Sequence, residues 1–328
     1  MKPGMQPDHL PPELAADDGL GDRFALLLRE ACQGRLGTIA WFRTDWQRGG
    51  ARTGRGTFRT DDGTEAPVIV KVPVGPAELT WNQRLQPDEQ DPYGITARLY
   101  ASGQALGDYD LAWIVMERFP EGPLFGLKRT DAIDLMADAA ARFYWRASRF
   151  PASDPQRREE WAQHFERARQ QCQTNNLPEK QRWNTVLRTA QKSLTAWVAE
   201  WRNRSTGEWC HGDLHPANAM SRSNRPEDPA MLIDLAEVRA GHWLEDAVYL
   251  ERLYWTRPER IAASPPVKLI GKKRAERGLR NDENAARLAD IRRVLFAGSA
   301  PAFLRTEGNP VVLKATLDVL EETVQRLG

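Results

Sequence analysis

The sequence carries almost no excess charge of either sign. Its 328 residues include 46 Lys and Arg against 45 Asp and Glu, a formal net charge of +1 at pH 7. Proteins that hold nucleic acid or an anionic membrane by long-range attraction need a clear positive excess. The balance argues against such a general polyanion-binding role, and we expect neither nucleic acid nor a membrane among the partners.

Long apolar runs are also missing. The longest wholly apolar stretch, residues 111–116, is far short of the roughly 18 residues that a membrane-spanning helix requires. The first twenty residues are rich in Pro, Asp and Glu and show no basic cluster followed by an apolar stretch, so they do not resemble a secretory signal. We expect a mobile leader over residues 1–20 and a cytoplasmic protein.

Cysteine is scarce. Cys32, Cys172 and Cys210 are an odd number at wide spacing, which fits neither a disulfide framework nor a C-x-x-C metal site. We therefore expect reduced thiols that serve as packing residues.

What the sequence does contain is typical of a folded protein with two domains. Hydrophobic residues make up 41% and charged residues 28%, a balance that disordered and fibrous chains do not show. The length is close to two domains of roughly 150 residues each. The spacing of apolar residues predicts strands at 38–42, 52–60, 67–72, 99–102 and 111–116, and helices at 23–32 and 78–85.

Helical periodicity dominates the rest of the chain. In residues 183–201 the apolar positions fall on one face of a long helix, which predicts that this face packs in the core. Two short β segments are predicted at 208–211 and 231–234. Further helices are predicted from Thr130 to Tyr144 and at 244–255, 283–296 and 311–327.

The most informative stretch is residues 209–220, Trp-Cys-His-Gly-Asp-Leu-His-Pro-Ala-Asn-Ala-Met, followed by Met-Leu-Ile-Asp-Leu-Ala at 231–236. Asp213 and Asn218 have the spacing of the D-x-x-x-x-N loop of phosphoryl-transfer enzymes, and Asp234 ends an apolar strand. Phosphoryl transfer needs a carboxylate that orients the attacking hydroxyl and accepts its proton, and oxygen ligands that hold Mg²⁺ on the phosphates. Asp213 suits the first task, and Asn218 and Asp234 suit the second.

These segments resemble the catalytic and metal-binding segments of the aminoglycoside phosphotransferase and choline kinase superfamily, whose plan covers this chain from about residue 20 to its end. The resemblance implies an α+β fold class, a bilobal protein-kinase-like fold with a β-rich N-terminal lobe and a mainly helical C-terminal lobe. We accordingly expect a nucleotide-binding lobe at 21–117 and a catalytic and acceptor-binding lobe at 118–328. The resemblance makes Asp213 the catalytic base, Asn218 and Asp234 the Mg²⁺ ligands, and Asp246 a structural residue that steadies the catalytic loop.

The resemblance extends to an upstream strand that carries a lysine. Residues 67–72, Pro-Val-Ile-Val-Lys-Val, are similar to the V-A-I-K pattern, so Lys71 is the expected contact to the α- and β-phosphates. The carboxylate that pairs with this lysine is either Glu78, which lies in a helical segment and is preferred, or Glu89, which lies in a more polar one.

Two further nucleotide contacts are implied by the same resemblance. The backbone at Met116, Glu117 and Phe119 would form the hinge that meets the adenine. Gly49 and Gly50 lie where a turn should cover the phosphates, although the sequence has no G-x-G-x-x-G motif and reads Asp-Leu-Ala where a protein kinase has D-F-G. The latter departure is ordinary for the superfamily and argues against a regulated protein kinase.

Two other interpretations were weighed against these. His211 and His215 flank Asp213 and suggest a metal-dependent hydrolase, although no third ligand stands at a recognisable spacing. The basic run at 268–280 suggests an anion or nucleic-acid site, but without interleaved aromatic residues it is more typical of a solvated loop between helices.

The sequence therefore predicts a small-molecule kinase that uses ATP and Mg²⁺ to phosphorylate a hydroxyl of an aminoglycoside-, amino-alcohol- or sugar-like acceptor. The alternative is a kinase-like ATP-binding regulatory module without transferase activity; the joint presence of the acidic, amide and lysine residues favours the enzyme. A cationic acceptor would need carboxylates in the C-terminal lobe, and the candidates are Glu245, Glu251, Asp318, Glu321 and Glu322. The oligomeric state is left open.

Overall fold

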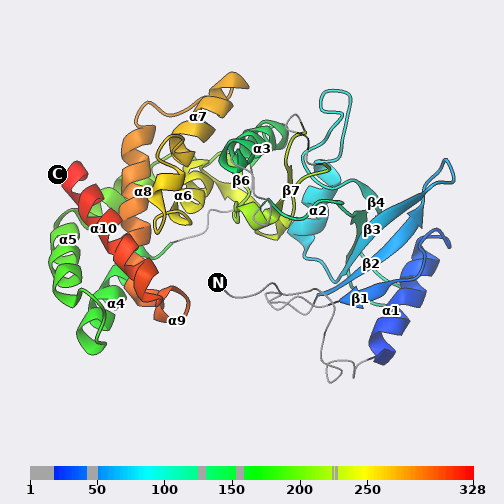
Figure 1. Cartoon of the computed structure of the whole chain (residues 1–328), viewed down its shortest axis with the longest axis horizontal. Coiled ribbons are helices and arrows are strands. Elements are labelled where there is room, and N and C mark those ends of the chain that lie inside the picture. Colours follow the sequence, from blue (N-terminus) through cyan, green and yellow to red (C-terminus); the bar gives the residue numbers. More distant parts are fainter. Residues whose placement is uncertain (1–17, 43–50, 125–130, 153–158, 224, 226–227) are drawn as a thin grey trace. The chain divides into compact units, whose positions relative to one another are not determined.

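The chain folds into two compact units, which are described separately. The computed structural model describes residues 18–42, 51–124, 131–152, 159–223, 225 and 228–328. One unit comprises Met1–Arg84 and Ala97–Arg118, and the other comprises Leu85–Thr96 and Phe119–Gly328 (Figure 1). The first is built around a sheet and the second is mainly helical, so the predicted α+β class, with a β-rich N-terminal part and a mainly helical C-terminal part, is confirmed.

The first unit is one antiparallel sheet with a helix on each face. Its strands are β1 (Ala40–Phe42), β2 (Arg52–Arg59), β3 (Glu65–Val72), β4 (Leu99–Gly103) and β5 (Trp113–Glu117), in the order β1-β2-β3-β5-β4. Helix α1 (Asp18–Ala31) packs Phe24 and Leu28 against one face. Helix α2 (Pro76–Arg84) packs Leu79 against Ile114 on the other. All five predicted strands are present.

The pleat of β3 decides where its lysine points. Val68, Val70 and Val72 are fully buried in the cluster that contains α1. Side chains alternate between the two faces of a strand, so Lys71 lies on the face that α2 covers. An ammonium group therefore sits on the side of the sheet where a carboxylate of α2 can reach it.

The second unit is built from helices and two small ribbons. Its main helices are α3 (Ala132–Ala147), α4 (Trp161–Thr174), α5 (Lys180–Arg202), α6 (Leu244–Arg252), α7 (Pro266–Glu276), α8 (Ala285–Ser299) and α10 (Pro310–Leu327). The ribbons pair β6 (Glu208–Cys210) with β9 (Arg239–Gly241), and β7 (Ala219–Met220) with β8 (Met231–Leu232). Among the described residues, no helix is long and apolar enough to cross a membrane.

The apolar stripe predicted for the long helix is confirmed on α5. The buried residues of this helix are the eight that the periodicity selects: Trp183, Val186, Leu187, Ala190, Leu194, Trp197, Val198 and Trp201. Thr130, the predicted start of the preceding helix, lies outside the described residues, as does most of the predicted leader.

The basic run at 268–280 is not the solvated loop that the sequence predicted. Residues up to Glu276 belong to α7, and the side chain of Arg274 is fully buried. Its guanidinium donates to Glu208 at 2.8 Å and lies over the rings of Tyr144 and Trp243. A buried arginine that is paired and stacked is a core element of the unit, which the periodicity of this polar segment did not reveal.

Residues 85–96 also depart from the sequence-based boundary, which placed them with the N-terminal part. They belong to the second unit because two arginines of α3 hold their backbone. Arg146 donates to the Gln86 carbonyl at 2.6 Å, and Arg142 donates to the Gly94 carbonyl. The amide of Leu232 in β8 donates to the Ile95 carbonyl at 2.7 Å.

Replacing Leu187 with Ala tests the packing of α5. The Leu187 side chain is fully buried, so removing it should lower the free energy of unfolding by about 2–5 kcal/mol. Gln191→Ala, on the exposed part of the same helix, should change it by less than about 0.5 kcal/mol. Urea denaturation of both variants measures the difference, and equal effects would contradict the assignment of the buried face.

Candidate active site

The loop between β6 and β7 is fixed by a buried carboxylate. Asp246, in the first turn of α6, accepts hydrogen bonds from the amides of His211 at 2.8 Å and Gly212 at 2.9 Å, and from the Tyr144 hydroxyl at 3.0 Å. Burial raises the pKa of Asp246, which the two amides and nearby His211 and Arg239 oppose. These hydrogen bonds fix the backbone conformation of the loop at His211 and Gly212.

This backbone conformation requires a glycine at position 212. Its φ of +85° lies in the left-handed region, and a Cβ here would overlap the Glu237 carbonyl oxygen and come within 2.5 Å of the Arg239 guanidinium. Only glycine fits a backbone that turns this way against its neighbours.

His211 links the loop to the segment that carries Asp234. Its Nδ1 accepts from the Asp213 amide at 3.3 Å, and its Nε2 lies 3.2 Å from the Ile233 carbonyl. Burial lowers the pKa of this imidazole, so the ring is neutral and Nε2 is the nitrogen that donates. Both ring nitrogens are thus occupied by backbone groups, which removes the basis for a His211 metal ligand. No cluster of three or more His, Cys, Asp or Glu suited to a metal occurs among the described residues.

The Asp213 carboxylate is surrounded by hydrogen-bonding partners. His215 Nε2 lies 3.3 Å from Oδ2, the Asn218 amide donates to the same oxygen at 3.0 Å, and the Tyr249 hydroxyl donates to Oδ1 at 2.9 Å. The hydrogen bond from His215 is the largest cause that holds the pKa of Asp213 at about 2, with Tyr249 and Asn218 adding to it against partial burial. This carboxylate is fixed in place and ionised at neutral pH.

Asn218 and Asp234 are brought together by the β7–β8 ribbon. The Ile233 amide donates to the Asn218 carbonyl at 2.9 Å, so Asp234 follows the residue that pairs with Asn218. Asp234 itself has a left-handed backbone, with φ of 60°. It lies two residues beyond the end of β8, whereas the sequence predicted that it would end the strand.

The donor atoms here fit a hard divalent cation. Asn218 uses its amide hydrogens on the backbone carbonyl and the carboxylate of Asp213, both at 3.0 Å, which leaves its Oδ1 as the atom that can ligate. One amide oxygen and one carboxylate are the oxygen ligands that Mg²⁺ prefers, with phosphates and water completing its shell.

In the first unit, the structure pairs Lys71 with Glu78 rather than with Glu89. Lys71 Nζ donates to Glu78 Oε1 at 2.6 Å, and the two side chains are 20% and 5% exposed. Glu89 is exposed and belongs to the second unit. The short, largely desolvated ion pair fixes the ammonium on the α2 face of the sheet.

The predicted hinge falls at the division between the units, after Arg118. The amides of Glu117 and Arg118 already donate within the first unit, to the carbonyls of Arg98 at 2.8 Å and Pro67 at 3.0 Å. The contact of an adenine with the backbone at Met116, Glu117 and Phe119 stays a prediction. Gly49 and Gly50, the predicted phosphate-covering turn, lie outside the described residues.

Tyr249 is the residue of this site that the sequence analysis missed. It stands three residues after Asp246 on α6, and residues three apart share a helix face. The spacing Asp-x-x-Tyr could have placed the hydroxyl beside the catalytic loop, because the resemblance had already placed Asp246 there.

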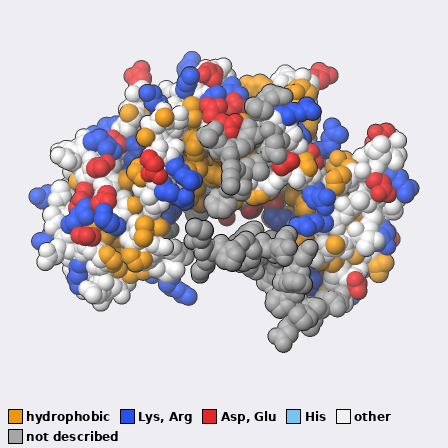
Figure 2. Space-filling model, in the orientation of Figure 1, with side chains coloured by type: hydrophobic (Ala, Val, Ile, Leu, Met, Phe, Trp, Pro, Cys, Tyr) orange, Lys and Arg blue, Asp and Glu red, His pale blue; other side chains and the backbone are white. Residues whose placement is uncertain are grey.

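Basic and acidic side chains are interspersed over the face seen in Figure 2, in keeping with the net charge of +1.

Comparison with known proteins bears on the family and the fold of the chain. The sequence model of the phosphotransferase enzyme family matches residues 52–280. Among curated proteins, none matches the chain.

Among solved structures, the chain is similar to an aminoglycoside phosphotransferase from Alicyclobacillus acidocaldarius, with 16% identity, a TM-score of 0.56, and coverage of 89% of this chain and 90% of that one. It is similar to a putative aminoglycoside phosphotransferase from Ralstonia eutropha, with 15% identity, a TM-score of 0.55, and coverage of 93% and 98%. It is also similar to a spectinomycin phosphotransferase in complex with ADP and spectinomycin, with 11% identity, a TM-score of 0.52, and coverage of 93% and 96%. At these identities the similarity shows a shared fold.

The family match spans well over half of the 328 residues and includes the lysine-bearing strand, the Asp213 loop and the Asp234 segment. The chain therefore belongs to the phosphotransferase enzyme family and is an ATP-dependent phosphotransferase that acts on an alcohol group.

Proposed function

We propose that this enzyme transfers the γ-phosphoryl group of ATP to a hydroxyl of a small molecule, with Asp213 as the residue that receives the hydroxyl. The observation that carries the proposal is the Asp213 carboxylate itself, which three side chains fix and which stays ionised. The spectinomycin phosphotransferase of similar fold, solved with ADP and its small acceptor, supports the same use of nucleotide and acceptor.

Asp213 acts by orientation more than by basicity. A carboxylate with a pKa of about 2 is a weak base, so it accepts a hydrogen bond from the acceptor hydroxyl and takes the proton only as the new bond to phosphorus forms. Holding the hydroxyl in line with the γ-phosphate converts a bimolecular encounter into an oriented one, which is where most of the rate in such enzymes arises.

Asn218 and Asp234 would hold Mg²⁺, which when bound neutralises charge on the phosphate oxygens. Asn218 has a second task that needs no metal, because its amide hydrogens orient Asp213. In the first unit, Lys71 would contact the α- and β-phosphates, with Glu78 keeping its ammonium in place. The backbone at Met116, Glu117 and Phe119 would receive the adenine.

Replacing Asp213 with Asn should remove turnover and keep nucleotide binding. The amide cannot accept the proton, so kcat should fall by about 10²–10⁴-fold while ATP affinity stays close to that of the wild type. Mg²⁺-dependent ADP release and calorimetric ATP binding measure the two effects. Asp134→Asn, which alters an exposed carboxylate of α3, is the matched control. Full activity of the Asp213 variant would contradict its role, and a wild type that binds Mg²⁺-ATP but transfers phosphate to no acceptor would favour the regulatory module.

Replacing Asp234 with Ala should instead affect the metal. The variant loses a carboxylate ligand, so the gain in ATP affinity that Mg²⁺ gives the wild type should disappear. Calorimetric titration of ATP with and without Mg²⁺ checks this, again beside Asp134→Asn. A variant in which Mg²⁺ still strengthens ATP binding to the wild-type extent would show that Asp234 is no ligand.

Replacing Tyr249 with Phe should lower kcat by about tenfold and leave the KM for ATP unchanged. The variant loses a hydrogen bond to a charged group, and such a bond contributes about 1.5–3 kcal/mol. Steady-state kinetics separate the two constants, and Tyr93→Phe on an exposed ring is the control. An unchanged kcat would mean that Asp213 needs no help from this hydroxyl.

A further inference from the structure

The two ring nitrogens of His215 contact different parts of the catalytic loop. Nδ1 accepts a hydrogen bond from the Ala217 amide at 3.2 Å, at the start of the short 3₁₀ helix Pro216–Asn218. Nε2 lies 3.3 Å from Oδ2 of Asp213. The ring therefore connects the backbone of this short helix to the carboxylate that the proposed function places at the reacting hydroxyl.

The contact at Nδ1 decides where the ring carries its hydrogen. A backbone amide can only donate, so Nδ1 must keep its lone pair available to accept. In a neutral imidazole the other nitrogen then carries the hydrogen, which places an N–H donor on Nε2, facing Asp213. His215 therefore donates to the carboxylate in its neutral form.

This donor completes the hydrogen bonding of one oxygen of Asp213. A carboxylate oxygen accepts hydrogen bonds at two lone pairs. On Oδ2 these are taken by the Asn218 amide at 3.0 Å and by His215. Oδ1 accepts from the Tyr249 hydroxyl at 2.9 Å, and its second lone pair has no partner in the part of the chain that the structure describes. The Asp213 side chain is 31% exposed, so a ligand can reach that position.

We propose that Oδ1 of Asp213 is the atom that receives the acceptor hydroxyl, and that His215 is a positioning residue that leaves Oδ1 available by occupying Oδ2. The inference rests on the proposed function and specifies the geometry of its base. In the transfer, the acceptor oxygen forms its bond to the γ-phosphorus, the bond from this phosphorus to the leaving oxygen of ADP breaks, and the hydroxyl proton passes to Oδ1. The donors on the carboxylate oppose its rotation during this step.

A purely structural role for His215 would be to cap the 3₁₀ helix, and two substitutions separate the roles. The side-chain oxygen of Asn can replace Nδ1 and still accept from the Ala217 amide, but this shorter side chain has no donor that reaches Asp213. The longer side chain of Gln can donate to Asp213 in place of Nε2, and Gln is not among the residues that cap well.

The kinetic test compares these two variants. Mg²⁺-dependent ADP release is measured in the full chain with water, kanamycin and aminopropanol as acceptors. His215→Asn should lower kcat by about tenfold, because it loses a hydrogen bond to a charged group, and should leave the KM for ATP unchanged. His215→Gln should recover most of the loss. A capping role alone predicts the reverse order, with Asn close to the wild type and Gln impaired.

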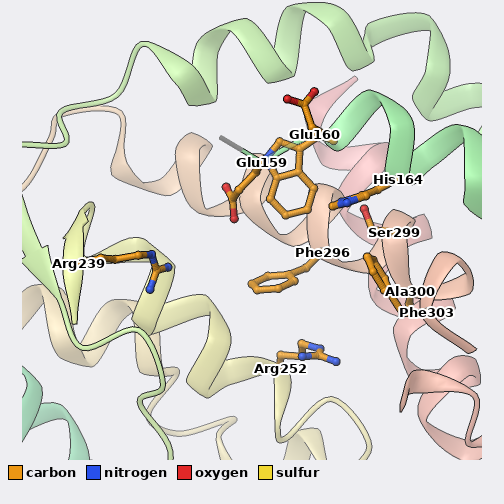
Figure 3. A pocket seen from close by; sticks show the side chains of 10 residues that line it. Glu159, Glu160, His164, Arg239, Arg252, Phe296, Ser299, Ala300 and Phe303 are labelled. Atoms are coloured by element: carbon orange, nitrogen blue, oxygen red, sulfur yellow. The ribbon is translucent and has the colours of Figure 1, made fainter. Parts of the chain in front are cut away.

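His164→Asn is the matched control. His164 lies on α4 and lines a cavity of about 380 Å³ (Figure 3), and none of the described residues that line this cavity belongs to the loop at 211–218. The same change of side chain at this place should leave kcat and KM unchanged. Thermal unfolding followed by circular dichroism checks that all three variants are folded.

A measurement on the resting protein tests the contact without catalysis. In the full chain, labelled with an NMR-active isotope on its histidine nitrogens, the nitrogen shifts distinguish the two tautomers under mildly alkaline conditions, where histidine rings are neutral. The signal that disappears in His215→Asn should show hydrogen on Nε2, and Asp213→Ala should shift its Nε2 resonance. The His164 signal, assigned with the control variant, should not move.

Three results would overturn the inference. They are a His215 ring with its hydrogen on Nδ1, an Nε2 resonance that Asp213→Ala does not shift, and a wild-type kcat in His215→Asn. The NMR result does not depend on turnover, so failure of the proposed function is a separate result. A wild type that shows the expected shifts but releases no ADP with any of the acceptors would support the contact of His215 with Asp213 and count against the proposed function alone.

Discussion

The buried carboxylate of Asp246 is the constraint on which the rest of the site depends. A charge removed from water must be satisfied by nearby donors, and here these are two consecutive backbone amides of the catalytic loop and a hydroxyl from α3. The amides can reach it only when Gly212 adopts its left-handed conformation. That turn presents the Asp213 side chain to Tyr249 and Asn218, so the position of the proposed base follows from a residue that never touches substrate.

The sequence predicted the features that depend on residues lying close together in the chain. Apolar periodicity located α5 and its buried face, and alternation along residues 67–72 placed Lys71 on the opposite face from its valines. The spacing of Asp213 and Asn218 indicated the loop, because a loop closed by its own hydrogen bonds needs its partners at fixed separations. Each of these signals lies within about twenty residues of chain, which is the range over which sequence patterns reflect geometry directly.

Features that depend on distant partners could not be predicted. Arg274 is buried because Glu208, Tyr144 and Trp243 surround it, and nothing in its own neighbourhood distinguishes it from the exposed Lys272. The same holds for the carboxylates that the sequence offered for a cationic acceptor. Glu245 counts as an available acid in the sequence, and only the tertiary structure shows that two arginines share it. Charge composition is a property of the chain, whereas charge balance at a site is a property of the fold.

Residues 85–96 belong to the second unit although they lie between strands of the first, and this has a consequence for folding during synthesis. This segment leaves the ribosome before the partners that hold it, among them Arg142, Arg146 and the amide of Leu232. The N-terminal sheet needs β4 and β5, which come directly after it, so the sheet can close before Arg142, Arg146 and Leu232 have been synthesised. The second unit is thus not a continuous piece of the polypeptide, and a cut after Arg118 would separate it from residues of its own core.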